Sequence, residues 1–133
     1  IYRKVGEAMR AMLIDPKAVP HIVEVDWDGT LQEIYRLLDV EIIDAVRIGD
    51  NAGAIYVDDE GLLKCREELE RRGFFFGPQG QPLAGRGLLV GPVDEDGNDT
   101  ECKLSLNMVR EYLIPWPEQD VPALLDKIER IYG

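Results

Sequence analysis

The chain has 133 residues, of which 45% are hydrophobic and 31% are charged, and its formal net charge is −11. This length suits a single domain that buries roughly two-thirds of the surface of its unfolded chain. No apolar run approaches the ~20 residues that a membrane span needs, and the negative charge opposes binding of nucleic acid through its phosphates. These properties argue against a membrane protein and against direct binding of DNA or RNA.

The cysteine and histidine content limits which disulfides, metal sites and catalytic groups the chain can form. The two cysteines, Cys65 and Cys102, lack C-x-x-C spacing, which is typical of a reducing compartment and predicts a cytoplasmic setting. We expect two ordinary half-buried thiols. His21 is the single histidine, which excludes His-based triads and metal sites with several histidine ligands. We therefore predict no metal and no cofactor. The N-terminal stretch lacks an uninterrupted apolar core, so a secretory signal is not expected.

The first part of the chain predicts a hairpin followed by a helix. Two apolar runs, residues 9–14 and 21–26, flank a Pro-containing turn and read as paired strands. Thr30 stands three residues before Glu33, which fits a capping box with reciprocal side-chain bonds to the two backbone N–H groups. The apolar residues that then follow at helical spacing are Leu31, Ile34, Tyr35 and Leu38.

The rest of the chain predicts further strands and three helices. The expected strands 42–48 and 54–57 form a hairpin with its turn at residues 49–53, and two further strands are expected at 87–93 and 101–104. The expected helices are 64–72, a helix from a Ser105 cap to about residue 113, and an amphipathic helix over about 118–132. Residues 74–87 look irregular. Together these elements predict one compact α+β domain over 1–133, with a core at about 9–114. It would hold a mainly antiparallel sheet of five or six strands, two packed helices and an added C-terminal helix.

The hexapeptide DWDGTL resembles the nucleophile loop of haloacid-dehalogenase-type phosphatases. In such an enzyme Asp26 would accept the phosphoryl group and Asp28 would act as acid/base. Asp50, in the stretch IGDNAGAIYVDD, lies only 24 residues further on, too close for the several strand-helix units that this fold needs. No lysine lies between Thr30 and Asp50. We therefore interpret DWDGTL as a strand, a turn and a capped helix, with no catalytic residue.

Two other loops offer weaker candidates. DEDGND, residues 94–99, resembles a calcium loop, but its glycine is fourth instead of sixth and Ser105 occupies the twelfth position, so a hairpin turn is expected. In PQGQPLAGRG, backbone amides beside an arginine suit an anion or nucleotide phosphate. The candidate ligand-binding residues are Gly80, Gly85, Arg86 and Gly87.

The order of AMLIDPKAVPHIVEVDWDGTLQEIYRLLDV, IYVDDEGLL and QPLAGRGLLVGPVDEDG resembles a family of small proteins encoded by phages, plasmids and other mobile elements and catalogued as a domain of unknown function. The likeness spans about residues 9–113. The resemblance implies a shared fold and no catalytic residue, and it implies that the Asp26-Trp27-Asp28 position varies among similar sequences. The stretch CREELERRG and the predicted helix after Pro117 depart from the family pattern.

Three hypotheses for function follow. The first is a non-enzymatic accessory protein of a phage or mobile element, in a bacterial or phage-infected cell, that binds a protein partner with a basic surface, as an acidic DNA mimic in a counter-defence role. Residues 15–60 carry 12 acidic and 3 basic side chains, in support of this idea. The acidic residues expected to carry it are Glu24, Asp26, Asp28, Asp44, Asp50, Asp58, Asp59 and Glu60. The second hypothesis is a nucleotide binder using Arg86, and the third is the phosphatase. Acidity that serves only solubility is the simplest alternative.

Overall fold

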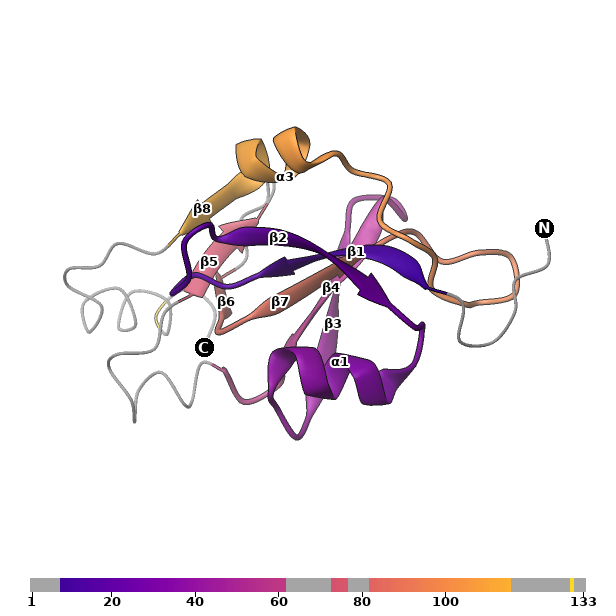
Figure 1. Cartoon of the computed structure of the whole chain (residues 1–133), viewed down its shortest axis with the longest axis horizontal. Coiled ribbons are helices and arrows are strands. Elements are labelled where there is room, and N and C mark those ends of the chain that lie inside the picture. The colour runs from indigo at the N-terminus through magenta and orange to yellow at the C-terminus, as the bar shows by residue number, and fades with distance from the viewer. Residues whose placement is uncertain (1–7, 62–72, 77–81, 116–129, 131–133) are drawn as a thin grey trace.

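The computed structural model describes residues 8–61, 73–76, 82–115 and 130 (Figure 1). The predicted helix 64–72, Cys65 and Gly80 lie outside these residues, as does the predicted helix 118–132 except for residue 130. Within them the fold is α+β, as predicted, with two helices and two antiparallel sheets. The prediction of one sheet is wrong, because the strands divide into a five-stranded and a three-stranded sheet.

The larger sheet has the strand order β2-β1-β7-β4-β3. Its strands are β1 (Met9–Ile14), β2 (Ile22–Trp27), β3 (Ile43–Ile48), β4 (Gly53–Asp58) and β7 (Gly87–Val90). The predicted hairpin of β1 and β2 is confirmed, in a register that runs from Met9 opposite Trp27 to Ile14 opposite Ile22. The predicted pair β3 and β4 is also confirmed. Strands β2 and β3 therefore form the two edges of this sheet.

Two strands of the smaller sheet come from the part of the chain predicted to be irregular. Its strands are β5 (Gly73–Phe76), β6 (Pro82–Ala84) and β8 (Leu113–Pro115), in the order β6-β5-β8. The prediction of irregular structure over 74–87 is wrong because the phenylalanine run pairs with a distant segment, with Phe75 opposite Ile114. A pairing between residues so far apart leaves no local pattern in the sequence.

Residues 101–104 form no strand, so that prediction is also wrong. The backbone N–H of Cys102 donates to the Arg10 carbonyl at 2.7 Å. Among the described residues, this bond is not followed by the regular series of backbone bonds that would make residues 101–104 a strand beside β1. Before this segment, a single bridge between Val93 and Asp99 closes the predicted turn of residues 94–99. Cys102 is buried, and burial raises the pKa of its thiol, so the thiol stays protonated at neutral pH.

Both described helices begin at the predicted caps. Helix α1 (Leu31–Leu38) follows Thr30, whose hydroxyl accepts from the Glu33 N–H at 3.2 Å, and α3 (Leu106–Tyr112) follows Ser105. The second half of the predicted capping box is wrong. Asp28, and not Glu33, accepts from the N–H of Thr30, because Glu33 is bound to Arg36. Neither helix has the length and apolar character needed to cross a membrane.

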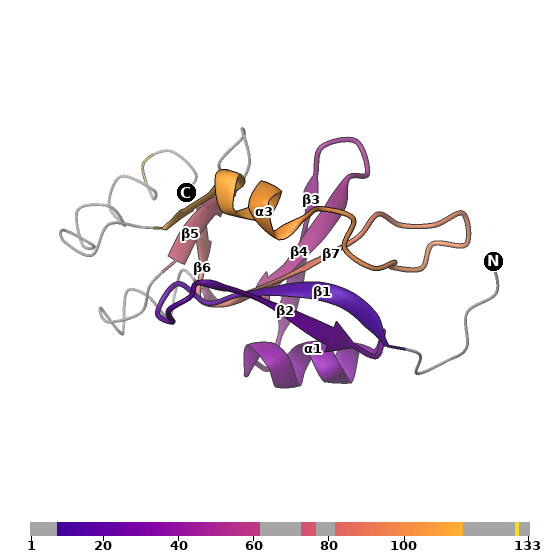
Figure 2. The same ribbon diagram turned by 45° about the horizontal axis from the view of Figure 1, so that its top comes forward.

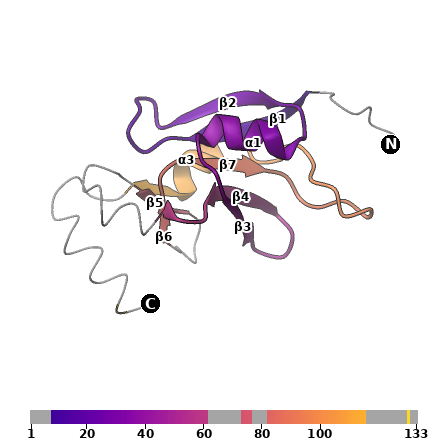
Figure 3. The same ribbon diagram turned by 90° about the horizontal axis from the view of Figure 1, so that it is seen from below.

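The larger sheet has a hydrophobic core on each face. Helix α1 lies on one face, while α3 and the smaller sheet lie on the other (Figures 1, 2 and 3). Alternate residues of a strand point to opposite faces, so Ala54 and Tyr56 of β4 join the core under α1 while Ile55 and Val57 join the other. This arrangement explains why β1, β4 and β7 read as nearly continuous apolar runs.

Candidate functional site

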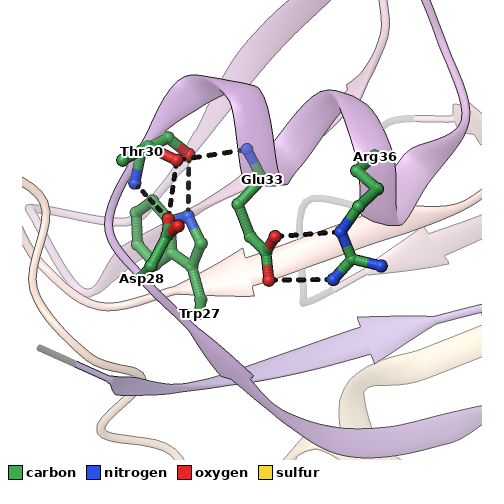
Figure 4. Close-up of polar contacts among 5 residues, drawn as sticks. All are labelled: Trp27, Asp28, Thr30, Glu33 and Arg36. Atoms are coloured by element: carbon green, nitrogen blue, oxygen red, sulfur yellow. Dashed lines mark hydrogen bonds and ion pairs between the residues drawn. The ribbon is translucent and has the colours of Figure 1, made fainter. Parts of the chain in front are cut away.

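The DWDGTL stretch forms a hydrogen-bonded turn that leads from β2 into α1 (Figure 4). Asp28 accepts from both the hydroxyl and the backbone N–H of Thr30, at 2.6 and 2.8 Å. These bonds, the hydroxyl bond first, lower the pKa of Asp28 below its usual value. A lowered pKa means that the charged carboxylate stabilises the fold above its unfolded pKa and that this contribution disappears as the pH falls. Asp28 is thus engaged in its own turn.

Trp27 and Glu33 complete this turn. The indole N–H of Trp27 donates to the Thr30 carbonyl at 2.9 Å, and Glu33 forms a two-bond ion pair with Arg36 (Figure 4). The motif is therefore a set of local contacts that fix where α1 starts.

The two parts of the phosphatase-like pattern lie far apart. Asp26 is exposed on β2, while Asp50 is exposed in the turn between β3 and β4. Since β2 and β3 are opposite edges of the larger sheet, the two carboxylates do not share a site. Within residues 8–61, 73–76, 82–115 and 130, no three His, Cys, Asp or Glu side chains are grouped to hold a metal ion.

The glycine-rich loop places Arg86 against protein groups. Its Nε donates to Asp15 at 3.2 Å and its Nη1 donates to the Leu37 carbonyl at 3.4 Å. A side chain at Gly87 would lie 2.8 Å from the Phe74 ring, so this glycine is explained by packing. Gly85 has φ +80° with open space around it. The nucleotide hypothesis stays a prediction, one that requires Arg86 to exchange its present partners for phosphate.

The predicted acidic surface is not one continuous face. Its members on β2 and β3 occupy both edges of the larger sheet, and Asp50 lies at the opposite end of the β3–β4 hairpin from Asp59 and Glu60. Asp58 is only 7% exposed, so the expectation that it belongs to the surface is wrong for this residue. It is buried because its carboxylate caps the turn after β4 by accepting from the Glu60 N–H at 2.9 Å.

The structure does bring one group of exposed carboxylates together. We call it the acidic corner, and its residues are Asp39, Glu41, Asp59 and Glu60. It lies where α1 ends, β3 begins and β4 ends, and the N–H of Asp59 donates to the Ile42 carbonyl at 3.0 Å across this junction. None of the four side chains forms an ion pair among the described residues. Ile42 directly follows Glu41 in the chain, and its side chain is 47% exposed.

Sequence reasoning missed Asp39 and Glu41. They are distant from Asp59 and Glu60 in the chain, and they approach them because β3 pairs with β4 in the register that sets Ile43 opposite Asp58. The predicted pairing of these two strands was a usable signal. A hairpin with a turn at residues 49–53 necessarily joins the residues before β3 to those after β4.

A second polar cluster anchors the loop after β7. The Tyr56 hydroxyl donates to Asp99, and Arg47 lies 4.0 Å from the other Asp99 oxygen. Asn51 adds bonds to both the N–H and the carbonyl of Val93, at 2.9 and 3.0 Å. Burial, followed by the contact with Asp99, raises the pKa of Tyr56 above its usual value. These contacts hold residues 93–99 on the larger sheet.

This cluster makes a testable prediction. Tyr56→Phe should lower the free energy of unfolding by about 1 kcal/mol, because one hydrogen bond to a carboxylate is lost while the ring stays packed. A raised tyrosine pKa stabilises the fold below the unfolded pKa of about 10, and this stabilisation is lost as the pH rises further. Urea unfolding should therefore show wild-type stability falling above pH ~10 more steeply than that of the variant. Parallel pH curves would contradict the assignment.

The described residues thus define a small α+β domain with a local carboxylate cluster and no grouped metal ligands. The chain belongs to the family described as "Domain of unknown function (DUF3846)", whose model matches residues 9–113. The matched region runs from β1 into the start of β8 and so includes strands of both sheets. Membership in a family of unknown function, which we expected from the sequence, is therefore confirmed. No curated protein and no solved structure gives a significant match.

Proposed function

We propose that this protein is a non-enzymatic accessory protein of a phage or mobile element that binds a basic surface of a host protein through the acidic corner. The observation that carries this proposal is that the four corner carboxylates form no ion pair within the described part of the chain. Five of the described basic side chains, by contrast, are matched with acidic ones. These are Arg10, Arg36, Arg47, Arg86 and Lys103.

The composition of the corner suits a protein partner. No lysine or arginine occurs in residues 37–46 or 53–61, so the like charges within these two stretches repel one another. Such repulsion costs stability and is relieved when a cationic surface docks. Ile42, which follows Glu41 and is 47% exposed, adds an apolar contact, and interfaces typically combine an apolar centre with a polar rim.

The arrangement of the acidic residues argues against mimicry of a DNA duplex. A mimic of a duplex needs carboxylates along one extended face, whereas the exposed acids among the described residues occupy both edges and both ends of the larger sheet. The corner is a compact patch at one junction. It fits a partner with a localised basic patch better than it fits a long DNA-binding groove.

The test compares two variants of equal charge in a tagged pull-down from bacterial lysate. The corner variant carries Asp39→Asn, Glu41→Gln, Asp59→Asn and Glu60→Gln. The matched control carries Asp26→Asn, Asp50→Asn, Glu95→Gln and Asp96→Asn, four exposed carboxylates elsewhere. Asparagine tolerates the positive φ of Asp39, 55°, so the first set should preserve the turn.

We expect wild type and control to retain the same proteins at low salt and to release them at high salt, because exposed charges are screened. The corner variant should lose at least about tenfold in binding, equivalent to about 1.4 kcal/mol. Equal loss in both variants would mean that only net charge matters, and retention by the corner variant would reject the corner as the interface. Either result removes the proposed site.

A further inference from the structure

A hollow lies where the turn between β1 and β2 meets α3 and β8. Its volume is about 320 Å³, and it is lined by Pro20, His21, Ile22, Arg110, Leu113 and Pro115. The segments that form it lie more than 80 residues apart in the chain, and the views in Figures 1 and 2 place the β1–β2 hairpin beside α3 and β8. It shares no residue with the acidic corner, and its ligand is independent of the function proposed above.

The walls of the hollow are largely apolar. Ile22 is 6% exposed and belongs to the core beneath α3. Leu113 and Pro115 are alternate residues of β8 and so face the same side of that strand. Pro20 adds a rigid ring from the turn. A space of about 320 Å³ is at the small end of ligand pockets, which suits a compact ligand with an apolar body.

Two polar residues, His21 and Arg110, belong to the lining. Arg110, in the last turn of α3, is exposed and forms no ion pair with any residue that the structure describes. His21 also lines the hollow, and its Nδ1 is buried without a hydrogen-bond partner among the same residues, so the imidazole has a polar atom that no described group satisfies. A guanidinium beside an imidazole is a donor set for an anion, and a carboxylate matches the planar fork of arginine with two bonds.

We propose that this hollow binds a small monocarboxylate with a compact apolar body, whose carboxylate is held by Arg110 and the imidazole of His21. A monoanion fits better than a phosphate for two reasons. One guanidinium is the single permanent positive charge among the described residues of the lining, and the net charge of −11 opposes entry of a dianion. The apolar walls then contribute affinity to the body of the ligand and none to a bare inorganic anion.

The test uses NMR titration of the full chain with 3-phenylpropionate, its neutral amide and inorganic phosphate. We expect 3-phenylpropionate to shift signals of His21, Arg110 and Leu113 saturably, with a Kd of about 1 mM. The amide should bind at least about tenfold more weakly, because it lacks the charge that the guanidinium pairs with. Phosphate should produce no saturable shift at these residues.

The variants are Arg110→Gln and the matched control Arg36→Gln, which removes the same charge from the last turn of α1. Arg110→Gln should weaken binding of 3-phenylpropionate by about tenfold or more, and Arg36→Gln should leave it unchanged. The proposal is overturned if no carboxylate-dependent shift is seen, if the amide binds equally well, if phosphate binds as tightly, or if both variants behave alike. The wild-type comparison of acid and amide decides the question even if Arg110→Gln is poorly folded.

Discussion

Trp27→Ala is expected to lower the free energy of unfolding by about 3–5 kcal/mol, the usual cost of deleting a buried tryptophan. The indole is 1% exposed, lies 6.5 Å from the Tyr56 ring between centroids, and belongs to the core beneath α1. Its removal would leave a cavity at the start of α1 and would leave the Thr30 carbonyl without its donor. Urea unfolding followed by far-UV circular dichroism measures the loss.

Two companion variants separate packing from chemistry in the same motif. Trp27→Phe keeps a ring and loses the indole hydrogen bond, so we expect a smaller loss of about 1–2 kcal/mol. Asp26→Asn, exposed on an edge strand, should change stability by no more than about 0.5 kcal/mol. A loss below about 1 kcal/mol for Trp27→Ala would contradict the structural interpretation of DWDGTL.

The phosphatase hypothesis is tested on the same proteins. Because Asp26 lies on the edge strand β2 and Asp50 lies in the turn after the opposite edge strand β3, we expect Mg²⁺-dependent phosphatase activity to be equal in wild type and Asp26→Asn. Activity that is present in wild type and lost in Asp26→Asn would establish Asp26 as a nucleophile and reject our interpretation.

Local signals in the sequence were enough for the hairpins and the helix starts. The Asp15-Pro16 turn and the apolar runs on either side of it predicted β1 and β2, and Thr30 with the spacing of Ile34 and Leu38 predicted α1. Each of these features depends on residues within a few positions of one another. Both helix caps, at Thr30 and Ser105, were predicted correctly for the same reason.

The features that were missed depend on contacts between distant segments. Strand β5 forms because Phe74 pairs with Pro115 and Phe75 pairs with Ile114. No pattern within residues 74–87 predicts a partner strand so distant in the chain. The capping box failed through local competition, since Asp28 is nearer in the chain to the N–H of Thr30 than Glu33 is. The acidic corner required a register, β3 on β4, to bring carboxylates from two regions together.

The loop after β7 provides the second large prediction, because its backbone returns directly over Gly91. The Gly91 N–H donates to the Thr100 carbonyl at 2.8 Å, and a Cβ at Gly91 would lie 1.9 Å from the Glu101 carbonyl oxygen. Ordinary van der Waals contacts of a Cβ begin at 3.4 Å, so the returning segment of the loop must move. Gly91→Ala should therefore cost about 3 kcal/mol or more, at the upper end of overpacking effects.

Gly97→Ala is the matched control, since Gly91 has a steric clash at its Cβ position and no positive φ, whereas Gly97 has a positive φ and free space there. It lies in the same loop with φ +81°, and nothing lies within 4 Å of the position that its Cβ would take, so its substitution costs about 1 kcal/mol of backbone strain and no clash. Thermal unfolding of the two variants should therefore differ clearly. If Gly91→Ala proves as mild as Gly97→Ala, the segment from Thr100 to Cys102 does not lie against β7 and β1. The anchoring role that we assign to Tyr56 and Asp99 would then fail with it, because both depend on the same return of the chain.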